Sequence, residues 1–169
     1  MSYDGTTTAI RLAAETDLPG ILAIYNEAVL YSSASYDLEP VSLEDRRAWY
    51  RARVDAGFPV TLAELDGQIV GFGSYGTFRA KPGYRFTVEH SLYIGSAWRG
   101  RGIGSAILAD LVLRARAAGY HAMIGGVDSA NQGSLRFHQA QGFVEIGRLR
   151  EVGRKFDRWL DLIFVELIL

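Results

Sequence analysis

The stretch Arg99-Gly100-Arg101-Gly102-Ile103-Gly104 decides how the rest of this chain is interpreted. It follows an alternating apolar segment and precedes a long amphipathic one, so a strand is expected to end there and a helix to begin. The first turn of a helix has unpaired backbone N–H groups and a partial positive charge, which favour phosphate. Glycines let the backbone approach a ligand closely, and the two arginines add charged donors. The stretch therefore predicts a cradle for phosphate or pyrophosphate.

Other phosphate-binding motifs fit this stretch less well. The dinucleotide-binding fingerprint spaces its glycines as G-x-G-x-x-G, whereas the glycines here fall as G-x-G-x-G. The Walker motif ends in Gly-Lys followed by Ser or Thr, and that ending is absent. For the segment taken in isolation, a glycine-rich turn without any ligand is the alternative.

Hydrophobic periodicity divides the chain upstream of this stretch into helices and strands. A strand is expected at 8–13, and Asp17 is a candidate N-cap for a helix with Pro19 in its first turn. A second helix is expected from Ser42 to Gly57, with a capping box completed by Asp45. Two strands, at 60–65 and 69–75, flank Asp66-Gly67, which is a strong hairpin signal.

Around and beyond the glycine-rich stretch, the pattern predicts two more strands, two more helices and a final hairpin. A loop is expected at 78–85, then a strand at 86–94 with His90 on its apolar face and Glu89 on its polar face. A helix ending at Gly119, a strand at 122–127 and a helix at 131–141 follow, and two long strands turn near Gly153. The order β-α-α-β-β-β-α-β-α-β-β predicts an α/β or α+β domain with a mixed sheet over residues 1–169.

Composition excludes several classes of protein. Apolar residues make up 49% of the 169 residues and charged ones 22%, which suits one compact domain. A net charge of −1 gives no reason to expect binding to nucleic acid or to an anionic membrane. The absence of cysteine and the presence of only three histidines argue against a metal site. Without a signal peptide or an apolar run long enough to span a bilayer, the chain is expected to be cytoplasmic.

Two motifs resemble those of the GCN5-related N-acetyltransferases, the GNAT superfamily. Arg99-x-x-Gly102-x-Gly104 is similar to the R/Q-x-x-G-x-G/A motif that binds the pyrophosphate of acetyl-CoA. Asn131 begins a string that is similar to the second signature, N-x-x-A/S-x-x-ϕ-Y-x-x-x-G-F. The segments 87–91 and 150–161 resemble the phosphinothricin and methionine-sulfoximine acetyltransferase branch. The resemblance covers nearly the whole chain. It implies a central mixed, mostly antiparallel sheet flanked by about four helices.

Acetyl transfer to an amine requires a group that removes a proton, because an α-amine is largely protonated at neutral pH. Glu89 is the candidate base, since the resemblance places the acidic base in this strand; a surface or salt-bridged glutamate is the alternative. His138 stands where many GNAT members have a tyrosine thought to protonate the departing thiolate. Its imidazole is a candidate acid, or only packs or hydrogen-bonds. His90 is expected to be buried and hydrogen-bonded rather than catalytic.

The resemblance also implies contacts with the two substrates. Contacts with acetyl-CoA are implied at Leu92, Tyr93, Ile94, Arg99, Gly100, Arg101, Gly102, Ile103, Gly104, Ser105 and Asn131. Contacts with the acceptor are implied at Arg79, Ala80, Lys81, Glu89, His90 and Ser91. The guanidinium of Arg79 suits a carboxylate or phosphinate, although a solvated basic loop is the ordinary fate of such a cluster.

The resemblance implies that the chain acetylates the α-amine of a small amino-acid analogue by direct attack in a ternary complex. The implied acceptors are phosphinothricin, methionine sulfoximine or methionine sulfone. One alternative is acetylation of a protein N-terminus or another amine; the basic segment 79–85 argues against a polyamine. Another is a sensor domain that binds acyl-CoA without catalysis. A basic cluster at Arg154, Lys155 and Arg158 implies, through the relatives' dimers, a homodimer whose C-terminal segments approach the partner's site.

Overall fold

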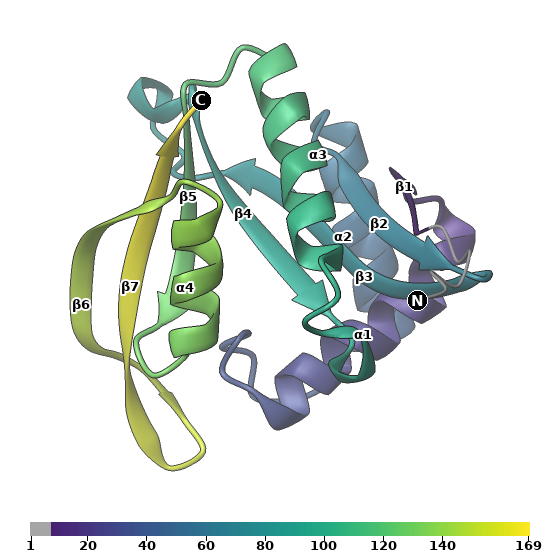
Figure 1. The fold of residues 1–169 in the computed structure, drawn as a ribbon, viewed down its shortest axis with the longest axis horizontal. Helices are drawn as coiled ribbons and strands as arrows, with labels where there is room; N and C mark the ends of the chain where they lie inside the picture. Colours follow the sequence, from purple (N-terminus) through teal and green to yellow (C-terminus); the bar gives the residue numbers. More distant parts are fainter. Residues whose placement is uncertain (1–7) are drawn as a thin grey trace, which may run out of the picture.

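The computed structural model describes residues 8–169, and the order of its helices and strands is the predicted one (Figure 1). Residues 1–7, which include the start of the expected domain and the segment in which no signal peptide is expected, lie outside the described part. The strands are β1 (Ala9–Leu12), β2 (Val60–Leu65), β3 (Gln68–Thr77), β4 (Thr87–Ile94), β5 (Ala122–Asp128), β6 (Val144–Lys155) and β7 (Arg158–Ile168). The helices are α1 (Leu18–Tyr31), α2 (Leu43–Asp55), α3 (Ile103–Ala117) and α4 (Gln132–Ala140).

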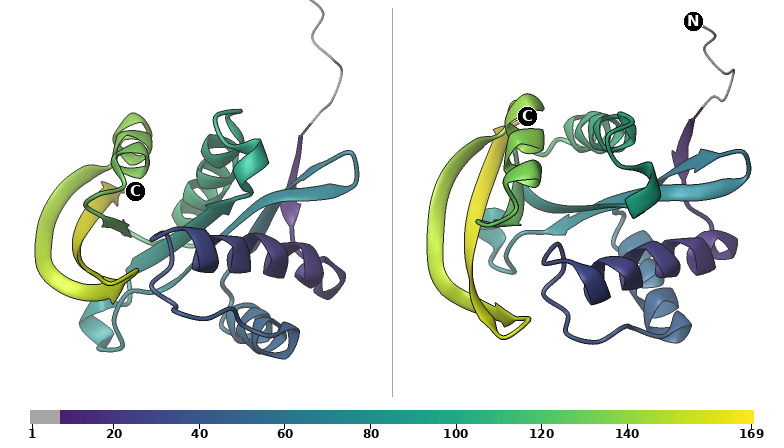
Figure 2. Two further views of the ribbon diagram at one scale, coloured as in Figure 1. Left: turned by 90° about the horizontal axis from the view of Figure 1, so that it is seen from below. Right: turned by 60° about the horizontal axis from the view of Figure 1, so that its bottom comes forward.

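Within residues 8–169, seven strands form one sheet in the order β1-β2-β3-β4-β5-β7-β6. Only the β4–β5 pair is parallel, and all other neighbours are antiparallel. Helices α1 and α2 cover one face, and α3 and α4 lie against the other (Figure 2). The predicted mixed, mostly antiparallel sheet with four flanking helices is therefore confirmed. No helix in this part of the chain is long and apolar enough to span a bilayer.

The two parallel strands at the centre of the sheet separate before they end. Pairing between β4 and β5 runs from Thr87 opposite Ala122 to His90 opposite Gly125, and the remaining residues of both strands do not pair with each other. The strands diverge visibly beyond that point (Figure 1). Unpaired backbone groups inside a sheet need other partners. The divergence therefore creates an opening where a ligand can contact the edge of β4.

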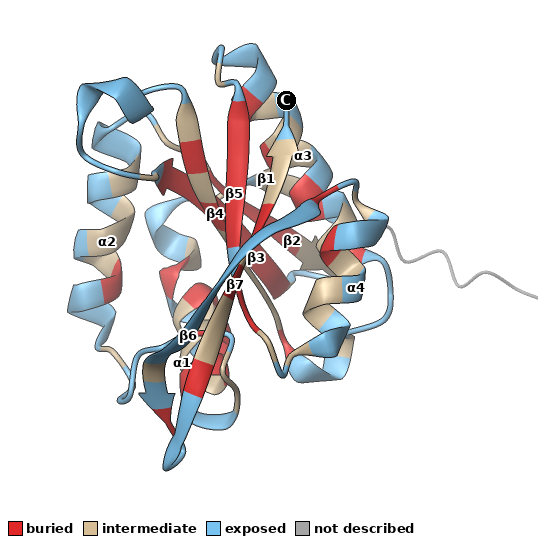
Figure 3. Ribbon diagram, turned by 90° about the vertical axis from the view of Figure 1, so that its left-hand side faces the viewer, coloured by how far each residue is buried: buried red, intermediate tan, exposed pale blue. Residues whose placement is uncertain are grey.

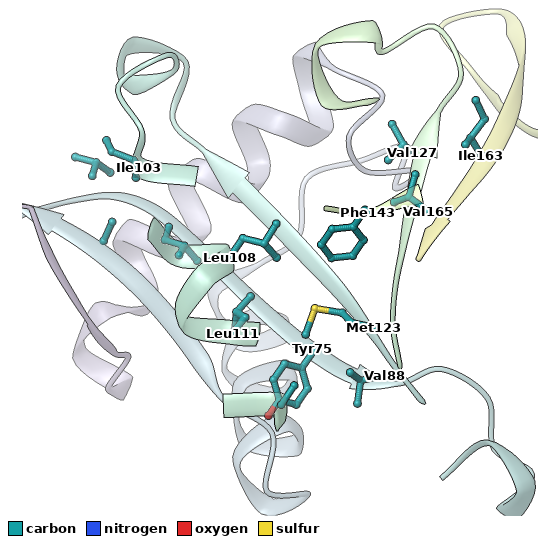
Figure 4. Packing of buried hydrophobic residues seen from close by; sticks show 14 residues of the cluster. Tyr75, Val88, Ile103, Leu108, Leu111, Met123, Val127, Phe143, Ile163 and Val165 are labelled. Carbon is teal, nitrogen blue, oxygen red and sulfur yellow. The ribbon is translucent and has the colours of Figure 1, made fainter. Parts of the chain in front are cut away.

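The core lies on both faces of the sheet. Under α3, Leu108 and Leu111 pack over Val88 and Met123 (Figure 4). On the other face, Phe72 is fully buried in a second cluster beneath α1 and α2. Burial is concentrated in the central strands, whereas β6 is exposed along nearly its whole length (Figure 3). The rigid part of the sheet is therefore the part that holds the opening.

The two predicted helix caps have different outcomes. Ser42 Oγ accepts a hydrogen bond from the backbone of Asp45 at 3.1 Å, and the Asp45 carboxylate accepts one from the backbone of Ser42 at 3.0 Å. This capping box is confirmed. Asp17 occupies the predicted N-cap position of α1, but its side chain does not cap the helix, because its carboxylate accepts hydrogen bonds from the backbone of Ala14 at 2.8 Å and from Arg11 at 2.7 Å. Asp17 therefore closes the 3₁₀ turn before α1 instead of capping α1.

The two long strands predicted around a turn near Gly153 are present, but the turn itself lies three residues further along the chain than Gly153. The chain reverses at Phe156-Asp157, where both residues have a left-handed backbone with φ of 52° and 57°. Gly153 lies inside β6 and pairs with Leu160. A Cβ added there would lie 2.5 Å from the ring of Tyr36. The glycine makes room for that ring, and the two-residue turn forms without any glycine.

Candidate active site

The loop before α3 has the geometry of an anion cradle. Gly100 and Gly102 have φ of +75° and +78°, which side chains with a Cβ resist, and nothing lies within 4 Å of a Cβ added at either position. Gly102 is the N-cap, and no side chain caps the helix, so the amides of the first turn are left for an external partner. Arg99 and Arg101 flank the loop and are both exposed. These features fit a diphosphate.

Helix α4 is held against the start of α3. The ring of Phe137 would lie 3.3 Å from a Cβ at Gly104, so this glycine permits the close contact. Gln141 Nε2 donates a hydrogen bond to Ser105 Oγ at 3.1 Å. Asn131 Oδ1 accepts from the backbone N–H of Ser134 at 3.0 Å and caps α4. The second sequence signature thus has a folding role, because Asn131 starts the helix that borders the opening.

Glu89 projects from β4 on the face covered by α1 and α2. Its side chain is half-buried and forms no salt bridge or hydrogen bond within residues 8–169, so the salt-bridged alternative is wrong for this part of the chain. Across the opening, a Cβ at Gly126 would lie 3.6 Å from Glu89 Oε1. Burial raises the pKa of Glu89, while Arg79 and Arg53 lower it through their charges. A half-buried, unpaired carboxylate with a raised pKa is well suited to accept a proton.

His90 and His138 meet on the opposite face of the sheet, with ring centroids 5.2 Å apart. His138 Nδ1 lies 2.7 Å from the carbonyl oxygen of Ser134, so it carries the hydrogen in the neutral ring, and the buried Nε2 has no partner. His90 is buried, as expected, but neither of its nitrogens has a partner among residues 8–169, so the hydrogen bond expected there is wrong for this part of the chain. Gly125 explains the fit of its ring, since a Cβ there would lie 2.8 Å from His90 Nε2.

Burial lowers the pKa of both histidines. Burial, with a smaller contribution from the charge of His138, lowers the pKa of His90 to about 3; burial also lowers the pKa of His138, although its hydrogen bond to Ser134 opposes this. Both rings are therefore neutral near pH 7. A neutral His138 with its hydrogen on Nδ1 presents Nε2 as an acceptor, so it must first gain a proton in order to act as an acid.

The predicted acceptor-binding residues are only partly brought together. Arg79 is exposed, with its guanidinium 5.0 Å from the ring of Phe78, and its charge reaches Glu89. Ala80 and Lys81 lie in the exposed loop before β4. Ser91 shares the face of Glu89, whereas the side chain of His90 points to the other face. A contact between His90 and an acceptor on the Glu89 side would have to be made by the backbone.

The C-terminal basic cluster splits into residues with different surroundings. Lys155 is buried, and its Nζ donates a hydrogen bond to the carbonyl oxygen of Ser35 at 2.7 Å. Arg158 pairs with the buried Asp128 at 3.1 Å, and Arg154 is exposed. Lys155 therefore ties the β6–β7 hairpin directly to the loop between α1 and α2, whereas Arg158 reaches Asp128 of β5, which also accepts a hydrogen bond from Ser33 of that loop.

A pocket of about 340 Å³ lies on the Glu89 face and was missed in the sequence. It is lined by Arg46, Trp49 and Arg53 of α2 and by Ser91 and Tyr93 of β4, among other residues. A larger hollow of about 710 Å³ is lined by other residues, none of them a predicted site residue. Positions 46, 49 and 53 share one helix face, and two arginines on a buried face are the signal that could have revealed the pocket. Within residues 8–169, no group of three or more potential metal-ligating side chains is found.

Comparisons with known proteins agree with this geometry. The profile of the acetyltransferase (GNAT) family matches residues 21–143. The L-methionine sulfoximine/L-methionine sulfone acetyltransferase of Pseudomonas paraeruginosa is 44% identical over 95% of this chain and 94% of that protein.

Two solved structures are closely similar. The phosphinothricin acetyltransferase of Sinorhizobium meliloti, in complex with acetyl-CoA, is 35% identical with a TM-score of 0.93 and covers 96% of this chain and 89% of that one. A structure named ribosomal-protein-alanine N-acetyltransferase from Brucella melitensis is 47% identical with a TM-score of 0.93, over 95% of this chain and 99% of that one. Fold, site and similarity agree that the chain belongs to the acetyltransferase (GNAT) family.

Proposed function

We propose that this enzyme transfers the acetyl group of acetyl-CoA to the α-amine of a small amino-acid analogue, of the methionine sulfoximine, methionine sulfone or phosphinothricin type. The observation that carries the proposal is the half-buried Glu89, which has no ion pair and lies just before the point where β4 and β5 separate, on the opposite face from the start of α4. The names of the relatives support this acceptor class. We expect the domain to act in the cytoplasm, without a metal ion.

Acetyl-CoA supplies an acyl thioester, whose carbonyl carbon an amine can attack. The loop would hold its diphosphate through the amides of the first turn of α3 and the charges of Arg99 and Arg101. The unpaired edge of β4 would offer main-chain groups of residues 92–94 to the rest of the molecule, and Asn131 would border it through α4. The two glycines with positive φ supply the shape of the loop, so they are the positions at which this assignment is tested.

Gly102→Ala is expected to weaken acetyl-CoA binding about 5- to 30-fold, because a left-handed backbone costs a residue with a Cβ roughly 1–2 kcal/mol. Isothermal titration calorimetry with acetyl-CoA measures this. The matched control is Gly119→Ala, at φ +81° beyond the other end of α3, which carries the same strain away from the loop. Equal losses of acetyl-CoA affinity in both variants would contradict the cradle.

The chain's own residues divide the chemistry between the two faces of the sheet. Glu89 receives a proton from the acceptor ammonium on the face of α1 and α2, which makes the nitrogen nucleophilic. Direct attack within a ternary complex would then form the C–N bond and break the C–S bond of the thioester without a covalent enzyme intermediate, and the departing thiolate would gain the further proton that the nitrogen loses. On the other face, His138 offers its free Nε2, and its role as an acid would require a proton delivered to that nitrogen first. Arg79, Lys81 and Ser91 are proposed to contact the acceptor.

The β6–β7 hairpin is proposed to form a homodimer interface. Apolar residues on its exposed side include Ile146 (51% exposed), Val152 (54%) and Trp159 (60%). Strand β6 is also an edge strand of 12 residues, and an exposed edge that carries several apolar side chains is usually covered in the native state. Because Lys155 of this hairpin binds the loop after α1 directly, and Arg158 is linked to it through Asp128, a dimer formed here would support the acceptor side of the site.

Ile146→Lys is expected to convert a dimer into a monomer, because a charge in the centre of an apolar interface must be desolvated on association. Sedimentation velocity measures the change. Leu113→Lys is the matched control, since Leu113 is 63% exposed on α3, outside the hairpin. A wild-type protein that sediments as a monomer would refute the dimer, as would a variant that stays dimeric.

One relative favours a second candidate, since its name refers to the alanine of a ribosomal protein. Release of free thiol from acetyl-CoA separates the candidates. The proposed function predicts turnover of methionine sulfone, methionine sulfoximine or phosphinothricin. Turnover only with peptides that begin with alanine would replace it by protein acetylation, and acetyl-CoA binding without turnover of any amine would replace it by a sensor.

A further inference from the structure

The four arginines of α2 fall into two classes. Arg47 and Arg51 point outward, and each pairs with a glutamate at 2.9 Å. Arg46 and Arg53 point toward the sheet, and within residues 8–169 neither forms a salt bridge. The outward arginines of α2 are thus paired, and the enclosed ones are not. The opposite is expected, because a charge that is removed from water needs a partner.

Aromatic rings pack against the two enclosed guanidinium groups, and a glycine leaves room for one of them. Arg46 is 5% exposed and lies 3.8 Å from the ring centroid of Tyr25 and 4.7 Å from that of Trp49, and its Nε has no hydrogen-bond partner. Arg53 lies 5.9 Å from Trp49 and rests on Gly76, where any Cβ would overlap its Nη1 atom. Aromatic faces attract the cations but do not neutralise them. Both groups are thus fixed, and both lack an anion.

The pocket of about 340 Å³ that they line contains acidic residues, but these are already engaged. The carboxylate of Asp37 accepts a hydrogen bond from Tyr25 at 2.6 Å, and that of Asp45 caps α2. The pocket also contains the side chains of Ser91 and Tyr93, which share the β4 face with Glu89. The pocket therefore has two fixed cations and hydroxyl groups but no uncommitted anion, which is the chemistry of a carboxylate site.

This pocket adjoins the candidate base. Gly76, on which Arg53 rests, is the residue paired with Glu89 across β3 and β4. Arg53 and Glu89 are near enough to interact through their charges, yet they form no salt bridge. Glu89 does not itself line the pocket, but an unpaired acid thus lies beside an unpaired guanidinium at its border. An α-amino acid carries an ammonium and a carboxylate on one carbon, so it can satisfy both.

We propose that Arg53, with Arg46 deeper in the pocket, binds the α-carboxylate of the acceptor while Glu89 faces its α-amine. This inference rests on the proposed acetylation of an amino acid and names the residues that select one. The exposed Arg79 is then left for the tetrahedral tail of the acceptor. A buried fork of this kind favours a free carboxylate over an amide or a peptide bond.

The test compares L-methionine sulfone with its carboxamide as acceptors. In Arg53→Gln, kcat/KM for the free acid should fall about 10- to 100-fold, since a hydrogen bond to a charged group contributes roughly 1.5–3 kcal/mol and each 1.4 kcal/mol is tenfold. The value for the carboxamide should stay within about twofold of wild type, because no charge pair is lost there. Arg53→Lys should restore part of the loss. Arg51→Gln, two residues away on the outer face, is the matched control.

The outcomes separate this inference from the proposed function. Equal losses for acid and amide in Arg53→Gln, or no loss for either, overturn the carboxylate site while acetylation stands. Calorimetry with methionine sulfone in the presence of CoA gives a readout without turnover. If the wild-type protein binds methionine sulfone but acetylates no amine, and Arg53→Gln no longer binds it, the carboxylate site is supported and the proposed function is refuted. A wild-type protein that neither binds nor acetylates the amino acid overturns both.

Discussion

Glu89→Gln is expected to lower kcat/KM for the acceptor by about 10²- to 10⁴-fold, the usual contribution of a positioned general base. The amide keeps the size and the half-buried position of the side chain but cannot accept the proton of the ammonium. Binding of acetyl-CoA should be unchanged, because the cradle lies beyond the end of β4. Thiol release, measured over a range of both substrates, checks the first expectation, and calorimetry with acetyl-CoA checks the second.

The pH dependence gives an independent readout of the same residue. A base must be deprotonated in order to act, so kcat/KM should rise with pH through the pKa of Glu89, which burial raises above the usual value. The acid limb of the profile should disappear in Glu89→Gln. Glu145→Gln, at an exposed position in β6, is the matched control and should retain the limb. A Glu89→Gln enzyme within a few-fold of wild type, with an unchanged profile, would show that another group takes the proton.

Local rules accounted for much of this fold. Asp66-Gly67 forms the predicted hairpin turn with φ of 51° and 77°, because such a turn needs two left-handed residues and this pair adopts them readily. The turn at Phe156-Asp157 has the same backbone but contains no glycine, so only the pairing of β6 with β7 could identify it. The role of Gly153 likewise depends on a contact with Tyr36, which is more than a hundred residues away along the chain.

The site residues whose positions follow from strand alternation were predicted from the sequence. Those whose positions depend on tertiary packing were missed. Strand alternation places Glu89 and His90 on opposite faces, as expected for adjacent residues of a strand. Alternation does not reveal what surrounds a ring, so the hydrogen bond expected for His90 was wrong. The cations of α2 were not predicted as site residues, because a helix pattern shows that Arg46 and Arg53 share a face but not that Gly76 admits one of them to the neighbourhood of Glu89.

His90→Leu is expected to make the protein less sensitive to acid. The folded-state pKa of His90 is lowered to about 3 from an unfolded value of 6.5, so the unfolded chain binds more protons between these values. The full stability is therefore present above pH 6.5 and is lost as the pH falls toward 3. At 1.36 kcal/mol per pKa unit, His90 removes about 2 kcal/mol of unfolding free energy at pH 5 and about 4 near pH 3.5.

Urea unfolding at pH 7, 5 and 4 measures this effect as the difference between variant and wild type. At pH 7 the two should be similar, because an apolar side chain replaces a ring whose nitrogens have no partner. At pH 5 the variant should be more stable by about 2 kcal/mol. Phe143→Leu is the matched control, since Phe143 packs 5.4 Å from both histidine rings and should change stability equally at every pH. If the unfolding free energies of His90→Leu and wild type change with pH in the same way, the folded protein binds a proton at His90 as readily as the unfolded chain does.

The pH dependence of stability is related to that of catalysis, because Glu89 and His90, on opposite faces of β4, both need to be deprotonated. Glu89 must be ionised to act as a base, and the ring pair behind it must be neutral for the fold to keep its stability. Acid therefore removes activity and stability together, although through different residues. The double variant Glu89→Gln/His90→Leu separates them: it should keep the gain in acid stability while remaining inactive. If the double variant shows no gain in unfolding free energy at acid pH, protonation of His90 is not what destabilises the folded protein in acid.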